Sequence, residues 1–282
     1  MPRQLTIAII GPGRLGTTLA LALKQAGYRI AEIVSSERAA SKRRARRLAA
    51  QVKAKVSTAS NAALDADLIW FCVADRDIAR VAGELGPRIK NKIAFHSSGA
   101  LPGDELSVLR RHRSAVASVH PLMSFVRGSS PSLKDVSFAI EGDLHATRVA
   151  RRIVRKLSGE TYSIRREDKA LYHAWGAFTS PLLIALLVSA EQAGRAAGIS
   201  AAQARRRMMP IVRQTLANYE ALGGAGAFSG PLVRGDVEVV RRHLAALKTL
   251  SPAREVYVAL SKAAVKVLPV TGNTKLSRVL KP

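Results

Sequence analysis

The sequence predicts an α/β fold in which an N-terminal doubly wound sheet (residues 1–165) is followed by an all-helical C-terminal domain (residues 166–282). Apolar runs of strand length alternate with helix-like segments up to about residue 165, as expected for repeated βα units. Strand signals then stop and long helical segments follow. The chain has 282 residues, which is enough for two domains with separate cores.

The first predicted strand and helix meet in residues 6–16, which read T-I-A-I-I-G-P-G-R-L-G. In this G-x-G-x-x-G spacing, Gly11 makes the tight turn, Gly13 lets the backbone approach a pyrophosphate, and Gly16 lets the helix pack on the strand. The apolar strand before it and the helical leucine spacing after it favour a Rossmann-type dinucleotide site over an ordinary glycine-rich turn. The residues expected to bind a cofactor here are Gly11, Gly13, Arg14, Leu15 and Gly16.

The second predicted strand, residues 30–34, indicates which nicotinamide cofactor is bound. An NAD site places an acidic side chain at the end of this strand. Here Ser35, Ser36, Glu37 and Arg38 follow the strand, then the basic residues Lys42, Arg43 and Arg44, and Glu32 lies inside it. Hydroxyl and guanidinium groups suit a 2′-phosphate, so we expect NADP. The alternative is that Arg38 and the basic run after it form only the solvated face of a helix.

The remaining elements continue the pattern. Residues 67–73 form a nearly continuous apolar run, which is typical of a parallel strand covered on both faces. Further strands are expected at 92–95, 114–119, 136–140 and 161–164. Helices are expected at 78–85, 102–110 and 146–157, and a basic helix that follows the second strand is expected to end at about Val52. The C-terminal half is expected to hold helices at 168–198, 200–222, 237–250 and 253–268, a glycine-rich loop at 223–236 and a loosely held tail after Pro269.

Bulk properties predict a soluble cytoplasmic protein. Cys72 is the only cysteine, no charged-then-apolar leader is present, and the apolar stretch at 177–190 is shorter than a spanning helix needs. The net charge of +25 comes from dispersed basic residues without a nucleic-acid-binding motif. We therefore expect neither nucleic acid nor a membrane as partner, no metal, and a field that favours small anionic substrates.

Polar side chains follow three of the predicted strands, where ligands of a doubly wound sheet lie. Ala74 and Asp75 are expected at the cofactor, although Asp75 could instead cap a helix. Ser97 and Ser98 could bind a substrate carboxylate or the nicotinamide amide, the alternative being a capped turn. His120, followed by a proline, is expected either to face the substrate or to make a structural hydrogen bond.

The helix predicted from residue 168 carries the best catalytic candidates. Lys169 and His173 are four residues apart, so they share one helix face about 6 Å apart along the axis. A lysine in the apolar mouth of an interdomain cleft could have a lowered pKa and donate a proton to a developing alkoxide; otherwise Lys169 is a solvated surface lysine. Further along, Arg234 could bind a carboxylate, while Asp236 is placed to cap a helix.

Five motifs together resemble a known family: I-G-P-G-R-L-G, H-S-S-G-A-L, H-P-L-M-S-F, K-A-L-Y-H-A and S-G-P-L-V-R-G-D. The chain resembles the bacterial Rossmann-like NADP oxidoreductases with a C-terminal helical domain of unknown function, in the 6-phosphogluconate dehydrogenase-like superfamily. The resemblance implies a catalytic lysine at Lys169; the asparagine usual four residues later is His173 here. It also implies a homodimer through the C-terminal helices, with residues 182–188 in a helix buried on every side.

Some members of this family are similar to ketopantoate reductases, which reduce a branched 2-keto acid with NADPH. We therefore expect an NADPH-dependent reductase of a small 2-keto acid. Lys169 would donate the proton, His120 or His173 would orient the carbonyl, and Arg234 or the Ser97–Ser98 turn would hold the carboxylate. The alternatives are a non-catalytic NADP(H)-binding redox sensor or scaffold, and a reductase of the same fold that acts on an imine or a deazaflavin.

Overall fold

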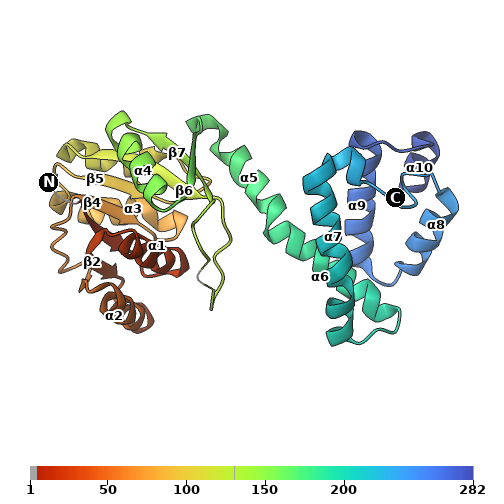
Figure 1. Ribbon diagram of the computed structural model, residues 1–282, viewed down its shortest axis with the longest axis horizontal. Helices are drawn as coiled ribbons and strands as arrows, with labels where there is room; N and C mark the ends of the chain where they lie inside the picture. The colour runs from red at the N-terminus through yellow and green to blue at the C-terminus, as the bar shows by residue number, and fades with distance from the viewer. Residues whose placement is uncertain (1–4, 130, 282) are drawn as a thin grey trace. The chain divides into compact units, whose positions relative to one another are not determined.

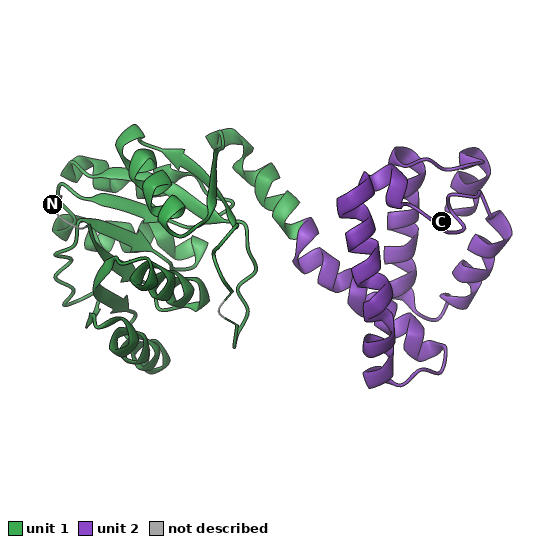
Figure 2. Ribbon diagram, viewed as in Figure 1, with its two compact units in different colours: residues 1–177 green, residues 178–282 purple. Residues whose placement is uncertain are grey.

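The structure is a computed structural model that describes residues 5–129 and 131–281. The chain divides into two compact units, residues 1–177 and 178–282 (Figure 2). This division falls later than the domain boundary that the sequence analysis placed after residue 165. Helix α5 (Lys169–Thr179) accounts for the difference, because its Lys169 and Tyr172 are buried in the first unit.

Within the described residues, eight strands form one sheet in the order β3-β2-β1-β4-β5-β6-β7-β8. The strands are β1 (Thr6–Ile10), β2 (Arg29–Ser35), β3 (Lys55–Thr58), β4 (Leu68–Phe71), β5 (Ile93–His96), β6 (Ala115–Pro121), β7 (Ser137–Gly142) and β8 (Glu160–Ser163). The strand order reverses between β1 and β4, which opens the crevice where ligands of such sheets bind.

Two features of the sheet differ from the sequence prediction. The pairing of β6 with β7 is antiparallel, so the last two strands run against the parallel part of the sheet. Strand β3 was not predicted, because this short edge strand has exposed residues at Lys55 and Val56 and therefore lacks an apolar run.

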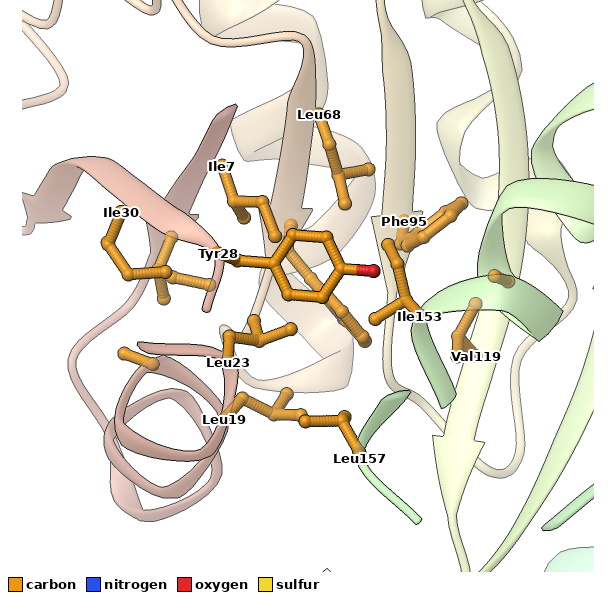
Figure 3. Close-up of a cluster of buried hydrophobic side chains, with 14 of the residues drawn as sticks. Ile7, Leu19, Leu23, Tyr28, Ile30, Leu68, Phe95, Val119, Ile153 and Leu157 are labelled. Atoms are coloured by element: carbon orange, nitrogen blue, oxygen red, sulfur yellow. The ribbon is translucent and has the colours of Figure 1, made fainter. Parts of the chain in front are cut away.

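Helices cover both faces of the sheet (Figure 1), which explains why its strands read as continuous apolar runs. Helices α1 (Arg14–Gln25), α2 (Ala39–Val52) and α4 (Leu144–Lys156) pack on one face and α3 (Ile78–Leu85) on the other. The segment predicted as a helix at 102–110 is a 3-10 helix, Gly103–His112. Figure 3 shows the first cluster, with labelled side chains from strands and helices: Ile7, Leu19, Leu23, Tyr28, Ile30, Leu68, Phe95, Val119, Ile153 and Leu157.

The second unit is helical. It contains α6 (Pro181–Ala196), α7 (Ala201–Ala227), α8 (Val237–Ala246), α9 (Ser251–Val267) and α10 (Asn273–Val279). The helix predicted across 168–198 is interrupted at Ser180, whose φ of −131° and ψ of −83° are not helical. Proline at the next position explains the break, because its ring disfavours the helical conformation of the residue before it.

The tail after Pro269 is held in place, contrary to the sequence prediction. Leu276 of α10 and Leu280, which directly follows this helix, are 0% and 1% exposed and pack with Val240 of α8. The two leucines are four residues apart, so a tail of low overall apolar content still has one apolar face.

The apolar residues 182–188 had predicted a helix buried on every side. Within one chain, helix α6 is instead largely exposed. Of the residues that the structure describes in α6, none is buried, and Leu182 and Ile184 are 49% and 58% exposed. Together with α5 it forms the helical stretch Arg166–Ala196, 31 residues with a mean hydropathy of 1.5 over the best window. By length and composition alone, this stretch could cross a membrane, which the shorter range 177–190 could not.

Candidate active site

The glycine turn after β1 has the geometry that its spacing predicted. Gly11 has a φ of +101°, and a Cβ there would lie 2.6 Å from the carbonyl oxygen of Cys72. A Cβ at Gly16 would lie 2.2 Å from the carbonyl oxygen of Gly11. At Gly13 the nearest heavy atom to such a Cβ is 3.9 Å away, so this position leaves open space in front of the backbone. The fold therefore requires glycine at positions 11 and 16. At position 13 the fold would accept a side chain, and glycine there instead keeps space free for a ligand.

A cavity of about 660 Å³ lies in front of this turn, at the carboxyl ends of the central strands. Six of the predicted cofactor residues line it: Gly11, Gly13, Ser35, Ser36, Arg38 and Ala74. The other predicted residues, Arg14, Leu15, Gly16 and Asp75, are not part of its wall. A cleft at this place in a doubly wound sheet is where a dinucleotide lies.

The cavity also has arginines that the sequence analysis did not choose. Arg44 of α2 lines it and donates a hydrogen bond from Nε to the carbonyl oxygen of Pro12, 3.3 Å away. Arg76 and Arg80 line the wall formed by the segment after β4. Arg44 belongs to the same basic run as Arg38, but no spacing rule distinguishes it from the arginines beside it, so only the structure indicates it.

Of the two glutamates near the cavity, Glu37 lines its wall and Glu32 does not, and each already has partners within the protein. Glu32 is buried within β2 and accepts hydrogen bonds from the backbone N–H groups of Ala63 and Leu64. Glu37 pairs with Lys42 at 2.7 Å, and hydrogen bonds from Lys42, Thr58 and Ser60 lower its pKa to about 2. Both carboxylates are therefore engaged by the protein itself.

Lys169 is buried, which rules out the interpretation that it is a solvated surface lysine. Its side chain is 1% exposed, and Nζ donates to the carbonyl oxygen of Ser98 at 3.1 Å and to Oγ of Ser118 at 2.7 Å. Burial lowers the pKa of Lys169 to about 8, while the charges of Glu141 and Asp75 oppose this shift. An ammonium of this kind can give up its proton near neutral pH.

His120 lies on the same side of the sheet as Ser118 and meets the helix α5. Its Nδ1 is 2.7 Å from the hydroxyl oxygen of Tyr172, and its ring centroid is 6.4 Å from that of His173. Burial, assisted by the positive charge of Lys169, lowers the pKa of His120 to about 3. The imidazole is therefore neutral in the physiological range.

Gly99 packs closely against the rings of His120 and His173. A Cβ at this position would lie 2.9 Å from Nε2 of His120 and 2.9 Å from Cδ2 of His173. The structure thus brings together three residues that were predicted to be catalytic, Lys169, His120 and His173, around the chain segment that follows β5.

The hydroxyls of Ser97 and Ser98 hold this segment in shape. Ser97 Oγ accepts a hydrogen bond from the indole of Trp70 at 2.8 Å. Ser98 Oγ donates a hydrogen bond to the Asp75 carboxylate at 2.8 Å and accepts hydrogen bonds from the backbone N–H groups of Ala100 and Leu101. His96 is fully buried below, with Nε2 2.8 Å from the carbonyl oxygen of Pro102. This geometry favours the capped turn over the predicted direct use of the two hydroxyls by substrate.

Arg234 lies in the second unit, in the loop between α7 and α8. Its side chain is 65% exposed and its guanidinium is 3.5 Å from the carboxylate of Asp236. Asp236 occupies the N-cap position of α8, but its side chain makes no capping hydrogen bond there.

Comparison with protein families gives two matches. Residues 6–94 match the model described as NADP oxidoreductase, coenzyme F420-dependent, and residues 136–264 match a domain of unknown function, DUF2520. No curated protein matches the chain. The first match confirms the predicted class of enzyme, an NADP-dependent oxidoreductase, and the predicted cofactor, NADP. It covers the glycine turn and the cavity described above.

Solved structures are similar over nearly the whole chain. Protein BF3122 from Bacteroides fragilis has a TM-score of 0.76 at 24% identity, covering 92% of this chain and 97% of its own. Protein TM1727 from Thermotoga maritima has a TM-score of 0.72 at 22% identity, covering 97% and 98%. An imine reductase from Pseudomonas sp. has a TM-score of 0.67 at 20% identity, covering 99% and 100%. These similarities confirm the predicted fold, a Rossmann-type sheet followed by helices.

Proposed function

We propose that this chain reduces the carbonyl group of a small 2-keto acid with NADPH, and that Lys169 is the proton donor. The observation that carries the proposal is the buried ammonium of Lys169, 1% exposed and held by Ser98 and Ser118. Those two hydrogen bonds use two of the three ammonium hydrogens, and we assign the third to the substrate oxygen.

The cavity at the glycine turn fits the cofactor. Gly13 leaves its backbone open to a pyrophosphate, and Ser36, Arg38 and Arg44 offer the hydroxyl and guanidinium groups that a 2′-phosphate prefers. NADPH, when bound, supplies the hydride. The residues of this chain then supply position and charge, which together account for most of the catalysis expected of such a site.

The proton balance follows from the state of the two basic groups. As the hydride adds to the carbonyl carbon, the carbonyl oxygen becomes an alkoxide. The alkoxide takes a proton from the Lys169 ammonium, and the lysine becomes a neutral amine. Neutral His120 cannot supply a second charge, so its role is to orient the oxygen through a hydrogen bond. The product is a 2-hydroxy acid, and the lysine regains its proton from solvent.

The charge of Lys169 also favours a carbonyl over an imine. A protonated imine is a cation, which an adjacent ammonium repels, whereas a developing alkoxide is attracted. The fold similarity to imine reductases keeps imine reduction as the second candidate. Whether Arg234 holds the substrate carboxylate stays a prediction, with its largely exposed guanidinium as support.

The test is NADPH oxidation, followed at 340 nm, with a panel of 2-keto acids headed by ketopantoate and with cyclic imines as the second panel. Turnover of a keto acid, abolished by Lys169→Met, is the expected result. Lys262→Met, which removes an exposed lysine of α9, is the control and is expected to retain turnover. Turnover of imines alone would establish the second candidate. NADPH binding without turnover of either panel would favour a sensor or scaffold.

We further propose that the chain forms a homodimer through its C-terminal helices, as the family resemblance implies. Helices α5, α6 and α7 expose large apolar side chains that a soluble monomer would rarely show: Leu171, Trp175, Phe178, Ile184, Ile211 and Leu222. Light scattering after size exclusion tests this: a dimer supports it, and a monomer or a detergent-dependent particle contradicts it.

A further inference from the structure

Helix α5 and strand β6 are joined by two hydrogen bonds of equal length. Lys169 Nζ meets Ser118 Oγ at 2.7 Å, and the Tyr172 hydroxyl meets His120 Nδ1 at 2.7 Å. The helix residues are three apart and the strand residues two apart, so each pair comes from a single face of its element. The first bond positions the proposed proton donor, which raises the question of what the second one positions.

The two nitrogens of His120 have different surroundings. Nδ1 lies 2.7 Å from the hydroxyl oxygen of Tyr172, which is 7% exposed; burial and the neighbouring Tyr162 raise the pKa of Tyr172, so its hydroxyl keeps its hydrogen. Tyr162 is the other candidate acceptor, but by geometry its hydroxyl oxygen makes no hydrogen bond within the described part of the chain, which leaves the hydrogen of Tyr172 for His120. Nε2 faces Gly99, and the absence of a side chain there lets both histidine rings approach the backbone closely. A neutral imidazole carries one hydrogen, and the partner of one nitrogen decides which nitrogen holds it.

We propose that Tyr172 donates its hydroxyl hydrogen to Nδ1 of His120 and thereby holds His120 in the Nε2–H tautomer. His120 then presents a hydrogen-bond donor, over Gly99, to the oxygen of the substrate. Tyr172 is a positioning residue: it acts on the substrate only through His120. The tautomer itself is independent of the reaction, whereas its catalytic value rests on the proposed function.

The tautomer matters because the substrate oxygen can only accept hydrogen bonds. With hydrogen on Nε2, His120 and Lys169 are both donors, and both stabilise the negative charge that develops on that oxygen. With hydrogen on Nδ1, the lone pair of Nε2 would face the lone pairs of the oxygen, and the interaction would become repulsive. The Tyr172 hydroxyl selects between these two cases.

The second unit contains a natural control for this pair. His243 of α8 and Tyr257 of α9 form the same kind of contact, with Nδ1 3.0 Å from the hydroxyl oxygen. Tyr257→Phe removes the same atom as Tyr172→Phe, and it does so outside the unit that holds Lys169.

The deciding experiment is a long-range ¹H–¹⁵N correlation spectrum of the full chain labelled with ¹⁵N-histidine, with His120 assigned through His120→Gln. The chemical shifts of the two ring nitrogens report directly which one is protonated. We expect the Nε2–H pattern in the unmodified protein and a mixture of tautomers in Tyr172→Phe, with Tyr257→Phe unchanged at His120. Hydrogen on Nδ1 in the unmodified protein, or an unchanged pattern in Tyr172→Phe, would overturn the proposal. The spectrum of the unmodified protein tests the tautomer without any variant, so a variant that fails to fold does not prevent the test.

Kinetics then test the catalytic consequence. With a keto acid that is turned over, Tyr172→Phe is expected to lower kcat about two- to fivefold, because only the fraction of molecules in the Nε2–H tautomer keeps the donor. Its dissociation constant for NADPH and the kcat of Tyr257→Phe are expected to stay unchanged. A Tyr172→Phe enzyme with full kcat would refute the catalytic role. Absence of keto-acid turnover in the unmodified protein would instead refute the proposed function, since the spectrum is recorded without substrate.

Discussion

The cofactor cavity and the contact between α5 and β6 lie in the same unit but are encoded differently. The cavity lies in front of the turn Gly11 to Gly16, whose glycine spacing can be recognised in the sequence, and Gly11, Pro12 and Gly13 of this turn line it. The contact joins Lys169 to Ser118, which are 51 residues apart. Local backbone rules therefore identify the first region, whereas the second exists only after the sheet has formed.

The largest expected effect comes from removing the ammonium group of Lys169. Lys169→Met keeps the length of the side chain but removes its proton, and kcat should fall by about 10²–10⁴, the usual contribution of a general acid. The NADPH dissociation constant should stay within about twofold, because Lys169 is not in the wall of the cofactor cavity. Steady-state kinetics and fluorescence titration measure the two quantities. A parallel loss in both would mean that the two regions are not functionally separate.

Substitution of an arginine in the wall of the cofactor cavity tests the other of the two regions. Arg44→Ala should raise the dissociation constant of NADPH about 10- to 100-fold, since a charge-assisted hydrogen bond contributes about 1.5–3 kcal/mol. The dissociation constant of NADH, which lacks the 2′-phosphate, should barely change. Arg47→Ala on the same helix is the control, because Arg47 is exposed and lies outside the cavity wall. Equal losses for both cofactors would assign Arg44 to the glycine turn and not to the 2′-phosphate.

The pH dependence of the reaction should report Lys169 directly. Reduction needs the ammonium form, so kcat/KM should fall about tenfold per pH unit above its pKa of about 8. Stability should move the opposite way. Between about pH 8 and the ordinary lysine value of 10.5, the unfolded chain binds more protons at this site than the folded chain, so stability rises with pH there. A flat kcat/KM up to pH 10 would contradict the role of Lys169 as the acid.

The smallest effect is expected from the hydroxyl that supports Lys169. Ser118→Ala removes a hydrogen bond that favours the ammonium form, so the alkaline fall of kcat/KM should begin about one pH unit lower. Below that pH the loss of kcat should be less than about tenfold. A profile that does not move would show that Ser118 fills space without influencing the proton of Lys169.

Much of the first unit could be predicted from the sequence because local rules govern it. The glycine turn and α3 (Ile78–Leu85) agree with the prediction. The antiparallel pairing of β6 with β7 and the edge strand β3 were missed, because neither follows from apolar periodicity. Pro181 was visible in the sequence, yet its effect on the long helix became clear only in the structure.

The site shows the same limit at the level of single residues. Lys169 and His120 were predicted as candidates from their places at a helix start and a strand end. Tyr172 was overlooked, because an aromatic residue inside an apolar helix has no local signal of function. For Ser97 and Ser98 the sequence left two alternatives, substrate binding and a capped turn. The structure favours the turn, because their hydroxyl oxygens bond to Trp70 and Asp75, which come from a neighbouring strand and the segment after it.

By itself, the sequence determined the fold class, the dinucleotide turn and the preference for NADP, because glycine conformations, apolar periodicity and side-chain charge act over a few residues. The tertiary structure decided that Lys169 is buried, that Tyr172 meets His120, and that Arg44 reaches the cofactor cavity. These properties depend on which surfaces exclude water together, and the pKa of a buried lysine is set by that exclusion and not by its neighbours in sequence.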